Sequence, residues 1–158
     1  MSSAISTPRL PPRAVIKAIW IGHRMLVRGT GGRLGLARPT PGGRFGMMGL
    51  RTTGRRSGRE RVAILGYCED GPALVTLAMN GWADADPAWL LNLLATPDAV
   101  VDLPDGRRPV RARIAEGEER ARLWACWDAD AGYGDDVDAF ARRRTGETAV
   151  VVLEPRPE

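Results

Sequence analysis

Hydrophobic and polar residues repeat with two different periods along this chain of 158 residues, and the period separates predicted helices from predicted strands. Residues 14–28 carry apolar side chains three or four positions apart with basic residues between them, which predicts an amphipathic basic helix. Helical spacing also marks three later segments, at residues 87–95, 116–128 and 135–144. Asp86 is suited to cap the first of these three, with Pro87 at the first helical position.

Strand-like runs separate these helices. They cover residues 45–53, 61–68, 72–79, 99–103, 108–115 and 149–155. Turn residues at 69–71 and 104–106 join neighbouring runs as antiparallel hairpins, and alternation along the fifth run places Arg111 and Arg113 on its solvent-facing side. Mostly antiparallel strands with helices packed outside them predict an α+β fold, built as a small barrel or a strongly curled sheet.

Glycine and proline content divides the chain into two parts. Residues 1–12 contain three prolines, and residues 29–44 contain six glycines and two prolines. We therefore expect residues 1–44 to form a tail, the basic helix and a connector. Residues 45–158 are expected to form the one folded barrel domain.

Charge is distributed unevenly between the ends of the chain. Residues 1–61 hold 13 basic side chains and one acid, a net +12, whereas residues 62–158 carry a net −8. Five arginines crowd the stretch from Leu50 to Val62, and Glu60 is the one acid there. Like charges at this density favour an anionic ligand or surface, although a solvated hairpin tip with no ligand is the simpler alternative.

Other residue types exclude several kinds of site. The chain has two cysteines, Cys68 and Cys126, and a single histidine, His23, too few for a zinc site or a histidine-based triad. We therefore expect no metal, reduced cysteines and a cytoplasmic location. No apolar run reaches the about 18 residues that a membrane-spanning helix needs. Residues 14–28 either pack on the domain's own core or lie on a membrane surface as a peripheral contact.

Four segments together resemble one known family. They read TTGRRSGRERV at 52–62, AMNGWADADPAWLLNLLATPDAVV at 78–101, ARIAEGEERARLW at 112–124 and VVVLEP at 150–155. In this combination the chain resembles the deazaflavin (F420)-dependent nitroreductase family, mainly actinobacterial nitroreductase and quinone reductase-like proteins, from Leu50 to Pro155. Its members are split β-barrel proteins of FMN-binding-like fold that use reduced coenzyme F420, so the resemblance implies that fold and that cofactor for residues 45–158.

The resemblance also implies site residues. The cofactor carries a phosphodiester and glutamates, which guanidinium groups bind through paired N–H bonds. By similarity to the family motifs, the cofactor-binding residues are Arg55, Arg56, Ser57, Gly58, Arg61, Val62, Met79, Asn80, Gly81, Trp89 and Asn92. Gly54 and Gly58 permit positive φ and close backbone approach. Tyr133 lies where members carry substrate-side tyrosines, so it is the candidate proton donor or substrate contact.

Three functions follow, in different classes. The resemblance implies a reductase that transfers a hydride from reduced F420 to a small-molecule acceptor, a quinone, nitroaromatic or enone. The same fold binding FMN or another cofactor is the first alternative. A non-enzymatic basic module for an anionic membrane or nucleic acid is the second; nucleic acid is not expected, because aromatic residues are not interleaved with the arginines. The family's barrels often pair, which leaves a homodimer open.

Several positions depart from the family pattern: members often have proline where Ile64 and Ala149 stand, and two further departures concern charge and bulk. Glu60 stands where members usually have proline, and its charge should weaken anion binding unless it pairs with Arg59 or Arg61. Trp82 stands where glycine is common, and is expected to add bulk or a stacking surface near the cofactor ring.

Overall fold

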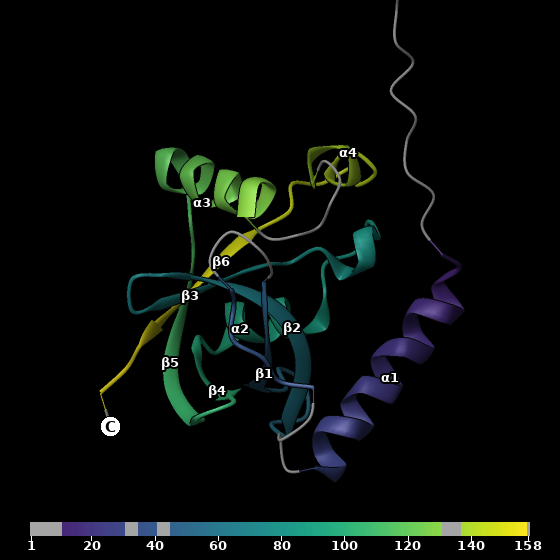
Figure 1. Cartoon of the computed structure of the whole chain (residues 1–158), viewed down its shortest axis with the longest axis vertical. Helices are drawn as coiled ribbons and strands as arrows, with labels where there is room; N and C mark the ends of the chain where they lie inside the picture. The colour runs from purple at the N-terminus through teal and green to yellow at the C-terminus, as the bar shows by residue number, and fades with distance from the viewer. Residues whose placement is uncertain (1–10, 31–34, 41–44, 131–136, 158) are drawn as a thin grey trace, which may run out of the picture.

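The computed structural model describes residues 11–30, 35–40, 45–130 and 137–157. Within them six strands close into an antiparallel barrel, in the order β1–β2–β3–β6–β5–β4. The strands are β1 (Gly46–Thr53), β2 (Glu60–Asp70), β3 (Ala73–Leu77), β4 (Asp98–Leu103), β5 (Gly106–Ile114) and β6 (Val150–Pro155). The predicted α+β fold with a mostly antiparallel barrel is therefore confirmed, and Figure 1 shows its arrangement.

Helices lie around the barrel rather than within its wall. They are α1 (Arg13–Gly29), the 3-10 turn η1 (Asn80–Trp82), α2 (Ala88–Ala95), α3 (Gly117–Asp130) and α4 (Val137–Ala141). In Figure 1 the helices α3 and α4 lie together at one end of the barrel, whereas α1 stands apart on another side. Helix α1 faces β2, and α2 contacts β1. The two helices therefore flank the two strands that carry the arginine-rich stretch.

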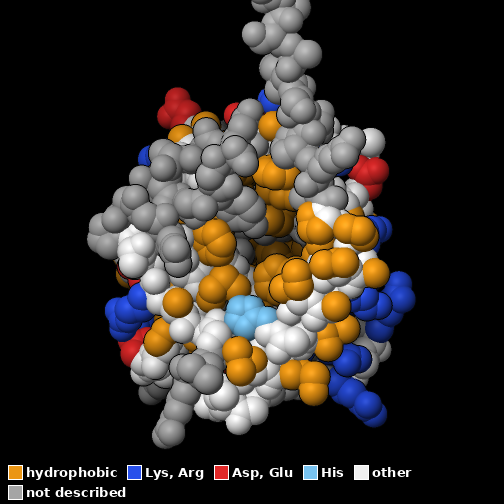
Figure 2. Space-filling view, turned by 45° about the vertical axis from the view of Figure 1, so that its right-hand side comes forward, with side chains coloured by type: hydrophobic (Ala, Val, Ile, Leu, Met, Phe, Trp, Pro, Cys, Tyr) orange, Lys and Arg blue, Asp and Glu red, His pale blue; other side chains and the backbone are white. Residues whose placement is uncertain are grey.

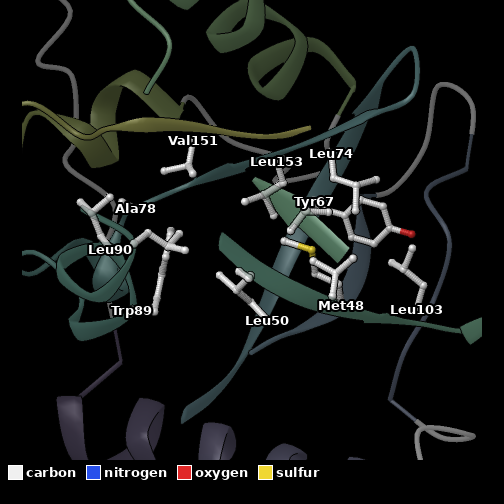
Figure 3. Close-up of a cluster of buried hydrophobic side chains, with 14 residues drawn as sticks. Met48, Leu50, Tyr67, Leu74, Ala78, Trp89, Leu90, Leu103, Val151 and Leu153 are labelled. Carbon is white, nitrogen blue, oxygen red and sulfur yellow. The ribbon is translucent and has the colours of Figure 1, made fainter. Parts of the chain in front are cut away.

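The barrel interior is filled by apolar side chains from every strand and from α2. Leu50, Val101 and Leu153 are completely buried there. Trp89 and Leu90 of α2 join the same cluster, which Figure 3 shows. Burial of this kind is the main favourable term in folding. It fixes α2, and with it the first residues that follow β1, against the barrel.

A second apolar cluster lies between the barrel wall and α3. Every residue of β3 is buried, because one face of this strand points into the barrel and the other packs under the helix. Val75 and Val152 face Leu123 and Trp127 across this second layer. Burial on both faces explains why the sequences of β3 and β6 are continuous apolar runs instead of alternating ones.

The start of α2 differs from the prediction. Asp86 does not cap the helix, and Pro87 precedes it in an extended conformation (φ −67°, ψ 146°) with no side-chain capping bond. The Asp86 carboxylate instead accepts a hydrogen bond from Arg144 at 2.8 Å. A tertiary ion pair has thus displaced the expected local cap.

The helix predicted for residues 135–144 is shorter in the structure, where α4 ends at Ala141. Residues 135 and 136 lie outside the described residues. The chain turns after α4 because the side chain of Arg144 points inward, to carbonyl groups of residues 78, 83 and 84. The other predicted helices and strands that fall on described residues are confirmed within a few residues of the expected bounds.

Acid titration should reveal one tie between α3 and the barrel. Arg122 donates two hydrogen bonds to the Asp70 carboxylate (2.9 and 3.0 Å), which lowers the pKa of Asp70 below its usual 3.8. A lowered folded-state pKa means that the pair stabilises the fold above the unfolded-state value and that this stabilisation is lost as the pH falls through the folded-state value. We expect Asp70→Asn to lower the melting temperature at neutral pH and to have no effect in strong acid. Thermal unfolding of both proteins across this range tests it, and a gap that is independent of pH would contradict it.

Candidate functional site

A cavity of about 1140 Å³ lies between α1, β2 and the segment that leads into α2. It is large enough for a ligand beyond ordinary drug size. Figure 2 shows the molecule with the α1 side brought forward: the face is hollowed, hydrophobic side chains gather around the hollow, and basic side chains lie along the right-hand edge. Both basic and apolar residues line the cavity.

The basic end is built by the turn between β1 and β2, residues 54–59, here called the arginine turn. Backbone bonds close it, from Gly54 N–H to the Arg59 carbonyl and from Gly58 N–H to the Gly54 carbonyl, both 2.8 Å. Gly58 has φ +66°, whereas Gly54 is required for space, because a Cβ there would lie 2.8 Å from Ser57 Oγ. Of the two glycines, only Gly58 therefore uses the positive φ that the sequence suggested for both.

Asn92 anchors the arginine turn to α2. Its side chain is buried, its Oδ1 accepts a bond from Arg55 N–H at 3.1 Å, and its Nδ2 donates to Thr52 Oγ1 at 3.0 Å. The Asn92 amide thus connects Thr52, near the end of β1, to Arg55 of the arginine turn. Asn92 also lines the cavity itself.

Basic side chains at this cavity have no acidic partner among the described residues. They are Arg13, Lys17, Arg24, Arg55, Arg56 and Arg61. Most arginines elsewhere on the barrel are paired, as Arg108 is with Asp105 (2.7 Å) and Arg111 with Asp98 (2.9 Å), and Arg59 of the arginine turn is an exception. The cavity therefore concentrates positive charge that acidic partners largely neutralise on the rest of the described surface.

Glu60 pairs with Arg51, not with Arg59 or Arg61 as the sequence suggested. Arg51 Nη1 lies 2.6 Å from Glu60 Oε1, and Arg51 Nε lies 2.8 Å from Asp102 Oδ2. The hydrogen bond to Asp102, followed by that to Glu60, raises the pKa of Arg51. Cross-strand pairing explains the choice, because Glu60 begins β2 opposite Thr53, on the strand that carries Arg51. Glu60 thus lines the cavity with its charge already compensated.

Met79, Asn80 and Gly81 form a second wall of the cavity. Asn80 has φ 46° and Gly81 has φ 61°, and the next residue, Trp82, has φ 62°. Trp82 is buried and stacks on Phe140 with ring centroids 5.8 Å apart, instead of offering a surface to the cavity. The expectation that Trp82 adds bulk or stacking near a cofactor ring is wrong, because the left-handed backbone turns its side chain toward α4.

Helix α1 covers the apolar end. Ile16 and Trp20 of α1 line the cavity together with Phe45, Leu65 and Trp127. Ile16 lies beside Gly81, since its Cγ2 would be 3.6 Å from a Cβ at that glycine. His23 Nε2 donates to the Gly35 carbonyl at 2.8 Å, which fixes the helix to the connector that follows it. One side of α1 therefore borders a ligand-sized space, a partner that the sequence alternatives of barrel core and membrane did not include.

The structure brings the predicted residues of the arginine turn and of three other segments to one cavity. Its lining includes Arg55, Arg56, Ser57, Arg61, Val62, Met79, Asn80, Gly81, Trp89 and Asn92. Gly58 shapes the turn without lining the cavity. Tyr133 lies outside the described residues. Sequence reasoning missed Lys17, Trp20 and Arg24, for which the amphipathic pattern of α1 was the available signal.

Across the described ranges, no group of three or more His, Cys, Asp or Glu side chains is placed to hold a metal ion. Nor is any helix of these ranges long and apolar enough to cross a bilayer.

A closed antiparallel barrel with a basic cavity on its flank defines the split β-barrel class, as comparison with solved structures confirms. A reductase described as F420-H2 dependent (FDR-A) superposes with a TM-score of 0.61 and 27% identity, over 75% of this chain and 96% of its own. A protein described as a domain-swapped dimer gives 0.63 and 26%, over 91% of this chain and all of its own.

Sequence comparison identifies the family within this class. The profile of the F420H(2)-dependent quinone reductases matches residues 21–155. The F420H(2)-dependent quinone reductase Rv1261c of Mycobacterium tuberculosis is 34% identical over 136 residues, 85% of this chain and 88% of its own. The putative F420H(2)-dependent quinone reductase Rv3178 of the same organism is 35% identical, over 68% of this chain and 87% of its own. The chain belongs to the F420H(2)-dependent quinone reductase family, and is therefore an oxidoreductase.

Proposed function

We propose that this protein binds F420 in the cavity beside β2 and reduces a quinone with the reduced cofactor. The observation that carries the proposal is the set of unpaired basic side chains at the cavity, which Arg55 and Arg56 of the arginine turn lead. A cavity with this excess of positive charge requires an anionic ligand, and the family relationship identifies which anion.

The donors at the basic end fit the anionic part of F420. Its phosphodiester and glutamate carboxylates accept paired hydrogen bonds, which guanidinium groups supply in a fixed planar arrangement. Arg55, Arg56 and Arg61 lie together with Ser57 at the end of the cavity, and Arg13 and Lys17 extend the positive charge along α1. These residues fit the cofactor, and their roles are to hold and to orient it.

The middle of the cavity suits the deazaflavin ring. The backbone of Met79 to Gly81 forms one side, and Gly81, which has no Cβ, lets Ile16 of α1 and a ligand approach this backbone closely. Trp89, which packs into the barrel core, supports the cofactor from α2. When bound, F420 supplies the hydride chemistry; the protein supplies position, charge and exclusion of water.

The apolar end suits a planar acceptor. Trp20, Phe45, Leu65 and Trp127 line the cavity, and the Phe45 ring stacks on Trp127 with centroids 5.8 Å apart. A quinone ring stacks well on such surfaces. Its reduction takes one hydride, which carries two electrons and a proton, and one further proton. Tyr133 is proposed as the donor of that proton or as an acceptor contact, as the sequence resemblance implies.

Turnover of reduced F420 with a series of acceptors tests this function. We expect F420 oxidation with a simple naphthoquinone, and slower reaction with an open-chain enone, which has no flat ring to contact the aromatic side chains of the cavity. A nitroaromatic compound has a flat ring, so its rate relative to the quinone reports on the reacting group alone. The same protein, purified without added cofactor, should lack the absorbance of bound FMN. A flavin spectrum together with no oxidation of reduced F420 would contradict the proposal and favour the FMN alternative.

Trp20 provides a specific test of the acceptor end. We expect Trp20→Ala to raise the quinone KM about fivefold, since an aromatic contact contributes about 1 kcal/mol, and to leave the Kd of F420 almost unchanged. Ile21→Ala is the matched control, because Ile21 is the next residue of α1, is 47% exposed and does not line the cavity. Steady-state kinetics measure both. An equal effect of the two variants would show that α1 does not contact the acceptor.

The outer face of α1 supports a further contact, proposed as a homodimer. Ile19, Met25 and Leu26 are exposed there, and such a large apolar surface marks an interaction site. A structural relative is a domain-swapped dimer. Light scattering should give twice the chain mass, and Met25→Glu should return the monomer. A monomeric parent protein that floats with anionic vesicles would replace the dimer with a membrane contact.

A further inference from the structure

Arg144 is a buried cation with every donor satisfied. It follows α4, and its side chain is 1% exposed. Nε donates to the Ala83 carbonyl (2.8 Å), and Nη1 donates to the Ala78 carbonyl and to Thr148 Oγ1 (both 3.0 Å). Nη2 donates to the Asp84 carbonyl (3.3 Å) and to Asp86 Oδ1 (2.8 Å). All five N–H groups of the guanidinium are therefore used.

The acceptors of Arg144 lie on both sides of the cavity wall formed by residues 79–81. The Ala78 carbonyl precedes this wall, and the carbonyls of Ala83 and Asp84 follow it. A single rigid side chain thus fixes both ends of a short loop. Thr145 adds to the same tie, because its N–H donates to Asp84 Oδ1 at 2.7 Å. Arg144 itself does not line the cavity.

The loop needs such a tie because its backbone is strained at Trp82. Asn80 and Trp82 both have left-handed φ values, 46° and 62°, and asparagine tolerates this region whereas a bulky residue does not. For Trp82 the conformation costs about 1–2 kcal/mol, and strain of this kind persists only where the surroundings hold it. Within the loop, Trp82 N–H bonds to the Met79 carbonyl (2.6 Å) and Asn80 Nδ2 donates to the Ala85 carbonyl (2.8 Å). Arg144 supplies the bonds that join this strained turn to the rest of the fold.

We propose that Arg144 is a positioning residue for the cofactor: it holds the backbone of Met79 to Gly81 in the conformation that forms the cavity wall. This inference rests on the proposed binding of F420 in that cavity. The side chain acts through the loop and touches neither cofactor nor acceptor. Without Arg144, the loop relaxes toward right-handed or extended conformations, and the population with a formed wall falls.

Lysine cannot replace this arginine. An ammonium group at the same place offers three donors from one point, whereas the five acceptors surround a plane. Arg144→Lys therefore keeps the charge and most of the packing but loses bonds to one end of the loop. We expect the Kd of F420 to rise about tenfold, the factor that follows if the competent loop falls to about a tenth of the population.

The test combines cofactor titration with hydrogen exchange on the full chain without ligand. For Arg144→Lys we expect weaker F420 binding, a higher KM for reduced F420 with an unchanged quinone KM, and faster exchange of amides in residues 79–85 while β1 and β6 keep their protection. Arg122→Lys is the matched control, because Arg122 also binds a carboxylate through two nitrogens but lies on α3, outside the cavity lining. It should change neither binding nor exchange in residues 79–85.

The outcomes separate this inference from the function on which it rests. No F420 binding by the parent protein overturns both. Binding by the parent and equal binding by Arg144→Lys, with faster exchange in the loop, overturns the positioning role alone. If Arg144→Lys does not fold, Thr148→Val takes its place, because it removes a single acceptor of Arg144 Nη1 with little change in shape. An unchanged Kd of F420 in that variant, together with faster exchange of the loop amides, overturns the positioning role equally.

Discussion

Replacing Arg55 and Arg56 together by alanine is expected to weaken F420 binding by about 100-fold or more. Both side chains line the cavity, and neither has an acidic partner among the described residues. A hydrogen bond to a charged group contributes about 1.5–3 kcal/mol, and about 1.4 kcal/mol corresponds to a tenfold change in Kd. Since both residues are exposed and form no part of the core, the melting temperature of the ligand-free protein should stay the same.

Arg59 supplies the control for this double variant. It belongs to the same arginine turn and carries the same charge, but it does not line the cavity. Arg59→Ala should change the Kd by no more than about threefold, an effect of screened long-range attraction that disappears at high salt. Fluorescence titration with oxidised F420 measures all three proteins. Equal losses in Arg59→Ala and in the double variant would mean that net charge alone, and not the cavity, attracts the ligand.

Replacing Asn92 by leucine is expected to have the second large effect, on stability and binding together. The change leaves Thr52 Oγ1 and Arg55 N–H without the partners that the buried amide supplies. Unsatisfied buried groups cost about 1–3 kcal/mol each, so the free energy of unfolding should fall by about 3 kcal/mol. The melting temperature should fall by roughly 6–12 °C, and the Kd of F420 should rise because the arginine turn loses its anchor.

Two further variants distinguish the anchor from general destabilisation. Thr52→Val removes the acceptor of Asn92 Nδ2 but keeps the bond from Arg55 N–H to Asn92 Oδ1, so it should lower stability and leave the F420 Kd nearly unchanged. Leu94→Ala, on an exposed position of the same helix, should alter stability by at most about 0.5 kcal/mol. Calorimetry and titration measure these effects. An Asn92→Leu protein that binds F420 as the parent does would show that α2 does not position the turn.

The architecture could largely be predicted from the sequence because local and tertiary preferences agree there. Hairpin turns at 69–71 and 104–106 join strands as expected, and β5 alternates, with Arg111 and Arg113 exposed. The arginine turn could also be predicted, since its glycines and charges have few structural alternatives. Ten of the cofactor residues that the family resemblance implied meet at one cavity, although the cofactor assignment itself stays a prediction.

Features that depend on distant partners could not be predicted. Asp86 has the sequence context of a helix cap, but Arg144, 58 residues away, takes its carboxylate. Glu60 neighbours two arginines in sequence and pairs instead with Arg51 across the barrel strands. In each case the carboxylate binds an arginine from another element instead of the partner nearest in sequence. A single sequence does not reveal which arginine the fold brings close.

The position of α1 shows the same limit. Its amphipathic pattern predicts the helix, but the pattern is equally suited to a protein core, a bilayer or a ligand. Trp20 and Arg24 become recognisable as site residues only when the fold places them across the cavity from β2. A helix that encloses a ligand carries apolar and basic residues for the ligand's chemistry, which the sequence alone does not state.

A crystal structure of the complex with F420 tests the central claim most directly. The account predicts the cofactor in the cavity between α1 and β2, with phosphate or carboxylate oxygens within hydrogen-bond distance of Arg55 or Arg56 and the ring beside Met79 to Gly81. F420 bound elsewhere on the protein, or bound here with the arginine turn directed into solvent, would contradict it.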